Sequence, residues 1–306
     1  MSASGKSFAF LTRHIQNLRG GSQPFLAEAS DGLLYVVKFT NNPQGTNLCF
    51  NESAGNELYR AFGLAVPSWK PLLVSDSFLD RNPDCWMLTP EGRLRPDSGM
   101  CFGSRYLGGE GMRLLEILPG NSFKRVQNHQ SFWQAWMIDI CAGHVDNRQA
   151  IFLEGAQREL EAFFVDMGHL FGGPKGELQP KLQASRYLDP RIYQSVSSEY
   201  FRSLEADVRC LNVDLLWRRI QALPDDWKTA SALGAFARCL CSLSTSSLIE
   251  SILNVMVETL RQANGREYKN LECGQRTQVS VLHTGVQAAE LGHRFVANSA
   301  GHPACA

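Results

Sequence analysis

Short apolar runs separated by turn residues fill the first third of the chain, and this pattern predicts β-strands. Leu48–Phe62 instead has apolar residues at helical spacing and is followed by Gly63, so we expect one helix there. Residues 90–99, rich in Pro, Gly and charge, predict a loop. The predicted strands are Phe8–Leu18, Phe25–Ala29, Leu33–Thr40, Trp69–Val74, Cys85–Leu88, Gly103–Leu107 and Leu114–Leu118.

From Asn128 onward the apolar positions follow a helical period, which places Phe132, Trp136, Ile140 and Cys141 on one face of a helix. A β-hairpin is predicted next, with arms Ala150–Glu154 and Leu160–Asp166. Further helices are predicted at Ser197–Val208, Val213–Ala222, Asp225–Leu240 and Ser246–Asn264, with Trp217 and Trp227 in the core. Residues 265–306 show no clear period and predict a weakly ordered tail.

Composition bears on the binding partners and the cellular compartment that we expect. Thirty basic and thirty acidic residues give a net charge of zero, so no global field favours nucleic acid or an anionic membrane. No apolar run reaches the roughly 18 residues that span a bilayer, and the N-terminal residues lack the apolar core of a secretory signal. Nine scattered cysteines without paired CxxC motifs indicate buried thiols rather than a zinc site. We therefore expect a cytoplasmic protein.

Candidate chemistry lies at both ends of the predicted hairpin. Asp146 precedes its first arm and Asp166 ends its second, and a hairpin brings its two ends together. Lys38 shares a strand face with Leu34 and Val36, and a lysine on an apolar face needs an anion such as a phosphate or a carboxylate.

Two glutamates of the Leu48–Phe62 helix, Glu52 and Glu57, are candidates to pair with Lys38, and the sequence leaves the choice open. The turn Gly20-Gly21-Ser22 could bring backbone N–H groups to phosphates, although most Gly-Gly pairs simply turn a chain.

An ordered set of motifs resembles the HipA-like kinase domains, in the smaller form without a helix-turn-helix partner. The resemblance covers about residues 15–195. It implies an α+β, two-lobed protein-kinase-like fold with a β-rich N-lobe (1–118) and a mainly helical C-lobe (119–264). The motifs are RGGSQP (19–24), LLYVVKF (33–39), FNE (50–52), FGLAVP (62–67), FGSRYLG (102–108), HVDNRQAIF (144–152) and FFVDMGHLFGG (163–173).

The resemblance also implies a cofactor, ATP with Mg²⁺. Lys38 would contact the α- and β-phosphates, and Gly20, Gly21 and Ser22 would cover them. The strand that enters the hinge would offer backbone groups to adenine at Glu116 and Leu118.

Four further positions carry the implied transfer chemistry. Asp146 would position and deprotonate the acceptor hydroxyl, and Asp166 would bind magnesium. Arg148 could neutralise phosphate charge, and Gln149 could reach the metal. Positioning and charge neutralisation supply most of the catalysis of phosphoryl transfer, so this small set suffices in principle.

Three positions depart from the protein-kinase pattern. Ile151 stands where those enzymes have an asparagine, Val145 replaces the arginine of His-Arg-Asp, and Met167 replaces the phenylalanine of Asp-Phe-Gly. A pseudokinase is therefore left open, because fold does not fix function.

The expected activity is ATP-dependent phosphoryl transfer to a hydroxyl, preferably on serine or threonine of a protein substrate. Transfer to a lipid or small molecule is an alternative, supported by the VDMGHLFGG form of the metal-binding segment. A nucleotide-binding scaffold with relic aspartates is another. A third is an unrelated α+β protein in which Asp146 and Asp166 merely cap hairpin ends.

Overall fold

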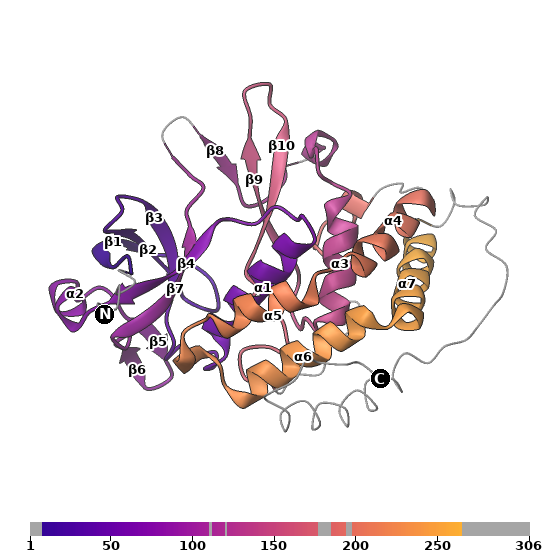
Figure 1. Ribbon diagram of the computed structural model, residues 1–306. Helices are drawn as coiled ribbons and strands as arrows, with labels where there is room; N and C mark the ends of the chain where they lie inside the picture. The colour runs from indigo at the N-terminus through magenta and orange to yellow at the C-terminus, as the bar shows by residue number, and fades with distance from the viewer. Residues whose placement is uncertain (1–7, 110–111, 120, 177–184, 194–197, 265–306) are drawn as a thin grey trace, which may run out of the picture.

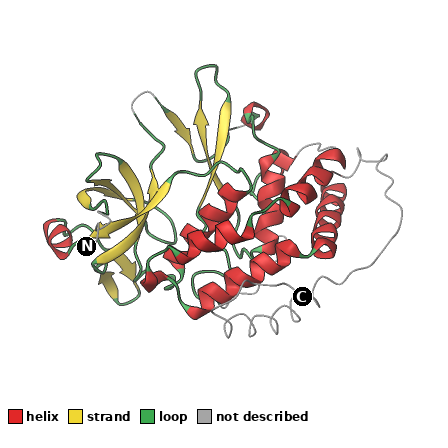
Figure 2. Ribbon diagram, viewed as in Figure 1, coloured by secondary structure: helices red, strands yellow, loops and turns green. Residues whose placement is uncertain are grey.

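The computed structural model describes residues 8–109, 112–119, 121–176, 185–193 and 198–264 (Figure 1). Strands gather at one end of the molecule and helices at the other, with a hairpin rising between them (Figure 2). The predicted α+β class, with a β-rich part followed by a helical part, is confirmed. The tail predicted at 265–306 lies outside the described residues.

The β-rich part is a five-stranded antiparallel sheet in the order β1-β2-β3-β7-β4. Its own apolar core includes Phe25, Val37 and Leu72. All five strands coincide with predicted runs, shifted by up to four residues at their ends. They are β1 (Leu11–Asn17), β2 (Phe25–Ala29), β3 (Leu34–Lys38), β4 (Trp69–Val74) and β7 (Gly99–Arg105).

Two short elements of this part correct the sequence analysis. The segment predicted as a loop contains β6 (Gly92–Leu94), which pairs with β5 (Met87–Thr89). Helix α2 (Asp76–Arg81) was not predicted. It begins at Ser75, whose hydroxyl accepts a hydrogen bond from the backbone N–H of Phe78.

Helix α1 (Leu48–Ala61) lies between the sheet and the helices, where it contacts β4, β7, α5 (Val213–Gln221) and α6 (Ala230–Ser244) (Figure 1). Every residue from Leu48 to Tyr59 is buried. Because the helix is covered on all sides, its polar side chains must find partners inside the protein.

A second sheet has the order β10-β9-β8. The predicted hairpin is confirmed: β9 (Gln149–Glu154) pairs with β10 (Leu160–Val165), and Gln149 stands opposite Val165. Strand β8 (Arg113–Leu115) pairs with β9 and not with the five-stranded sheet.

The helical part packs around α3 (Ser131–Cys141). Burial of α3 extends beyond the predicted face, because Trp133, Met137 and Ile138 are buried as well as Phe132, Trp136 and Cys141. The other elements are α4 (Ser198–Arg209), α7 (Ser246–Asn264) and three 3-10 turns, η1 (Ser122–Arg125), η2 (Pro190–Tyr193) and η3 (Asp225–Trp227).

The helix predicted at Asp225–Leu240 is two elements. The turn η3 comes first, and α6 then starts afresh because the hydroxyl of Thr229 caps it by accepting from the N–H of Ala232. Trp227 is buried as predicted, and Trp217 packs against the main core.

None of the described helices is by itself long and apolar enough to cross a membrane. Helices α6 and α7 reach that length and composition only together, and they are bent by 83° at their junction.

Candidate active site

Three charged side chains meet where the sheet, α1 and the hairpin join. Lys38, the last residue of β3, is bound by a carboxylate oxygen of Glu52 on α1, and its Nζ lies 2.8 Å from Oδ1 of Asp166. The side chains of Lys38 and Glu52 are 7% and 3% exposed, whereas that of Asp166 is 24% exposed. Lys38 therefore has the anionic partners that its apolar strand face predicted.

Opposing effects set the ionisation of these groups. Burial acts to lower the pKa of Lys38, but Asp166 and Glu52 outweigh it, so that pKa is raised above its usual value. Burial acts to raise the pKa of Asp166, and Lys38, with help from His169 and Arg148, lowers it to about 2. Lys38 and Asp166 are thus a charged pair at neutral pH.

The structure settles which glutamate pairs with Lys38. Glu57 instead accepts a hydrogen bond from Nε1 of Trp69 at 3.0 Å and forms an ion pair with Arg219 of α5 at 2.7 Å. Glu52 also accepts hydrogen bonds from the backbone N–H groups of Met167 (3.2 Å) and Gly168 (2.9 Å). One carboxylate thus holds both Lys38 and the chain that follows Asp166.

Two other α1 residues, which the sequence analysis did not single out, fix this same segment. The side-chain amide of Asn51 donates to the carbonyls of Gly168 (2.9 Å), Leu170 (2.9 Å) and Gly173 (3.1 Å). A Cβ added to Gly55 would lie 2.6 Å from Cβ of Met167 and 2.6 Å from Cδ1 of Leu170. The FNE motif contained Asn51, but nothing in it shows that an amide reaches three carbonyls.

The loop that carries Asp146 is joined to the segment after Asp166. The N–H of Val145 donates to the carbonyl of His169 at 3.1 Å, and the N–H of Phe171 donates to that of Ala142 at 2.7 Å. Asp146 is half-buried, and its Oδ1 accepts from the N–H of Asn147 at 2.7 Å. Both aspartates therefore belong to one hydrogen-bonded region.

Arg148 does not face this region in the way that phosphate neutralisation requires. Its side chain is 1% exposed, and its Nε and Nη2 each donate to the carboxylate of Asp139 at 2.9 Å. Its Nη1 donates to the carbonyls of Val165 (2.9 Å) and Asp166 (3.2 Å). We correct the predicted role accordingly, because these donors are occupied by protein groups.

The turn that contains Gly20, Gly21 and Ser22 joins β1 to β2 at the edge of the five-stranded sheet. Gly20 adopts φ +136°, a conformation that favours glycine. Asn42 donates to the carbonyl of Ser22 at 2.7 Å. Gln23 is hydrogen-bonded to Leu88 of β5 twice, accepting from its N–H at 2.6 Å and donating to its carbonyl at 2.9 Å.

The predicted adenine contacts lie just beyond β8. Glu116 is exposed, and Leu118 is buried in the main core. Among the described hydrogen bonds and ion pairs, none joins either residue to Lys38 or Asp166.

The groups around Asp166 suit a hard cation such as Mg²⁺, which binds oxygen ligands and often draws several from a nucleotide. Asp166 has a partly exposed carboxylate, and the exposed residue Gln149 stands opposite Val165, the residue before Asp166, in the hairpin register. Across the described ranges, no cluster of three or more His, Cys, Asp or Glu side chains forms a metal site on its own. A metal bound by Asp166 would take its other ligands from oxygen groups such as those of a nucleotide phosphate or water.

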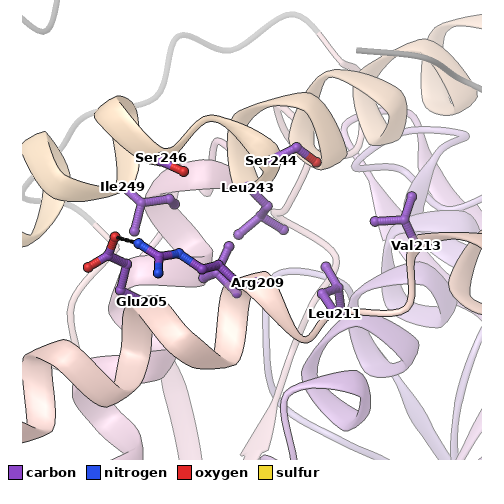
Figure 3. Close-up of a pocket in the computed structure, with 9 residues that line it drawn as sticks. Glu205, Arg209, Leu211, Val213, Leu243, Ser244, Ser246 and Ile249 are labelled. Carbon is purple, nitrogen blue, oxygen red and sulfur yellow. Dashed lines mark hydrogen bonds and ion pairs between the residues drawn. The ribbon is translucent and has the colours of Figure 1, made fainter.

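A separate groove of about 260 Å³ lies in the helical lobe between α4, α5 and the α6–α7 junction. Figure 3 shows Leu211, Leu243 and Ile249 pointing into it, with the ion pair of Glu205 and Arg209 at its side. None of the candidate site residues lines it.

No family model matches the chain, and no curated protein matches it. Among solved structures, the chain is similar to the proinflammatory kinase CtkA of Helicobacter pylori, with 13% identity and a TM-score of 0.48 over 79% of this chain and 95% of that one. It is also similar to the Golgi casein kinase, with 12% identity and a TM-score of 0.45 over 82% of this chain and 75% of that one. For the Golgi casein kinase with Mn/ADP bound, the identity is 12% and the TM-score 0.38, over 80% and 73% of the two chains.

Proposed function

We propose that this chain is a kinase of HipA-like type that transfers the γ-phosphoryl group of Mg²⁺-ATP to a hydroxyl, preferably on serine or threonine of a protein. The observation that supports it most is the Lys38–Glu52–Asp166 cluster, which is hydrogen-bonded through the segment after Asp166 to the loop of Asp146. A basic group, a metal-binding carboxylate and a second aspartate are the parts that phosphoryl transfer needs in one place.

Each residue then has a distinct task. Lys38, held by Glu52, would bind the phosphates, and Asp166 would hold the metal. Asp146 would orient the acceptor hydroxyl and accept its proton. When bound, the metal supplies positive charge that stabilises the phosphates.

Intact mass spectrometry of the purified chain after incubation with Mg²⁺-ATP tests this proposal. We expect added phosphoryl mass on the wild type but not on Asp146→Asn or Asp166→Asn. Asp76→Asn is the matched control, because Asp76 forms an exposed ion pair with Arg95 and touches none of the site residues. Loss of ATP without added mass would mean transfer to water, and adding lipids or small hydroxyl compounds would then test them as acceptors. If neither the protein mass nor the amount of ATP changes when the metal ion is varied, the proposed transfer is wrong.

Sequence and contacts together also support a nucleotide-binding scaffold as a second candidate. Ile151 stands where protein kinases place a metal-binding asparagine, and Lys38 already binds a carboxylate oxygen of Asp166. A scaffold would bind ADP and keep its cellular role in Asp146→Asn, whereas a kinase would lose that role.

A further inference from the structure

A buried ion pair crosses the centre of the molecule behind the candidate site. Asp139 of α3 and Arg148, just before β9, have side chains 0% and 1% exposed and make two hydrogen bonds of 2.9 Å. The hydroxyl of Tyr59, on α1, donates to Asp139 at 2.7 Å. The Arg148 guanidinium also lies over the Tyr59 ring, 5.2 Å from its centroid. Three elements distant in sequence therefore meet at one carboxylate.

The donors of Arg148 point at the main chain that carries Asp166. Its Nη1 donates to the carbonyls of Val165 and Asp166, the peptide groups on either side of the Asp166 Cα, and lies 3.2 Å from Sδ of Met167. Asp166 itself adopts φ +59°, a left-handed conformation that is unfavourable for a residue other than glycine. Hydrogen bonds on both sides of this Cα therefore hold a backbone geometry that the chain would not keep unaided.

Helix α1 also binds the main chain around Asp166. Glu52 accepts from the N–H groups of Met167 and Gly168, while Tyr59 reaches the carbonyls of Val165 and Asp166 through Asp139 and Arg148. The main chain is thus held on both sides of the Asp166 Cα, before it at the Val165 carbonyl and after it at the Asp166 carbonyl and the Met167 N–H, while Lys38 binds the carboxylate itself. A buried ion pair by itself contributes little net stability, so its use here is one of geometry.

We propose that Tyr59, Asp139 and Arg148 are positioning residues that hold Asp166 in the conformation in which it binds a divalent metal. The inference rests on the proposed function, since it assigns these residues to the metal-binding carboxylate of that site. Partners that orient a metal ligand typically change metal affinity about 10- to 100-fold when they are removed.

Calorimetric titration of ADP, with and without MgCl₂, into the full chain tests the inference. The variants are Tyr59→Phe, which removes one hydroxyl, and Arg148→Lys, which keeps the charge but loses the fork geometry. Tyr193→Phe is the matched control. Tyr193 is also buried, but its hydroxyl accepts a hydrogen bond from the N–H of Tyr187 and is not part of the Tyr59–Asp139–Arg148 hydrogen bonds. Thermal unfolding of each variant establishes that it is folded.

We expect Tyr59→Phe and Arg148→Lys to lose about 10-fold or more of the gain in ADP affinity that Mg²⁺ brings. Metal-free ADP binding should be unchanged, and Tyr193→Phe should behave as wild type. If both variants keep the full gain in affinity, the positioning role is wrong while the proposed function stands. If ADP binds the wild type no more tightly with Mg²⁺ than without it, the proposed function itself is contradicted and the positioning role is lost with it.

Discussion

The two sides of the candidate site are held by different means. On the side of α1, Lys38, Glu52 and Asn51 are buried: Lys38 pairs with Asp166, and Glu52 and Asn51 bind the main chain that follows it. On the other side, Gly20 and Gly21 are exposed, and their turn is anchored mainly by the amides of Gln23 and Asn42. Under the proposed function, the comparison sets a buried, charge-paired lysine and metal side against an exposed glycine turn that is predicted to cover the phosphates.

Breaking the buried side should have the largest effect. Lys38→Met removes the cation that two carboxylates share and leaves the buried Glu52 without a cationic partner. We expect the free energy of unfolding to fall by about 3–5 kcal/mol, measured by urea titration, and transfer to be abolished. Adding Glu52→Gln should recover part of the stability but no transfer. Wild-type stability in Lys38→Met would contradict the buried pair.

The close packing of α1 against the metal-binding segment predicts the next largest effect. Gly55→Ala places a Cβ 2.6 Å from Met167 Cβ, so we expect a loss of about 1–3 kcal/mol in thermal or urea unfolding. Gly234→Ala on α6 is the control, because its nearest neighbour would be an atom of the flexible Arg238 side chain at 3.6 Å. That variant should be neutral or gain up to about 1 kcal/mol from helix propensity. Equal responses at the two glycines would show that the α1 contact is not close.

The exposed side should respond in binding more than in stability. Gln23→Glu puts a carboxylate oxygen against the carbonyl of Leu88 and loses the donated hydrogen bond, which is worth about 1 kcal/mol. We expect the KM for ATP to rise several-fold with kcat nearly unchanged. Gln16→Glu, an exposed change on β1, should leave KM as it is. A fall in kcat with constant KM would contradict this prediction, because it would show that Gln23 affects the transfer step rather than nucleotide binding.

The smallest predicted effect concerns acid. Burial, then Arg148 and His169, lowers the pKa of His144 well below its usual 6.5, and Asp139 lies 3.5 Å from its Nδ1. Below pH 6.5, His144 therefore binds a proton in the unfolded chain but stays neutral in the folded chain. The contribution of His144 to the free energy of unfolding is thus complete above pH 6.5 and is lost as pH falls. Between pH 7 and pH 6 it amounts to about 0.7 kcal/mol. Urea titrations of His144→Phe should show a correspondingly shallower pH dependence; an unchanged slope would contradict the burial effect.

Sequence periodicity gave the ladder of strands, the limits of α1 and the hairpin that unites Asp146 with Asp166, because these depend on local apolar spacing. It also predicted that Lys38 needs an anion. It could not choose between Glu52 and Glu57, which requires knowing which side of a wholly buried helix faces β3. A motif likewise does not tell which way a guanidinium points, and that is why the predicted role of Arg148 was wrong. The short elements α2 and β6 depend on one cap and one tight pairing, which apolar periodicity does not register.

A crystal structure of the chain with MgCl₂ and a non-hydrolysable ATP analogue tests the central claim most directly. The account predicts a metal about 2.0–2.1 Å from a carboxylate oxygen of Asp166, with phosphate oxygens within hydrogen-bond distance of Nζ of Lys38. A nucleotide seated elsewhere, for example in the groove between α4 and α7, with Lys38 still paired to Asp166, would contradict it.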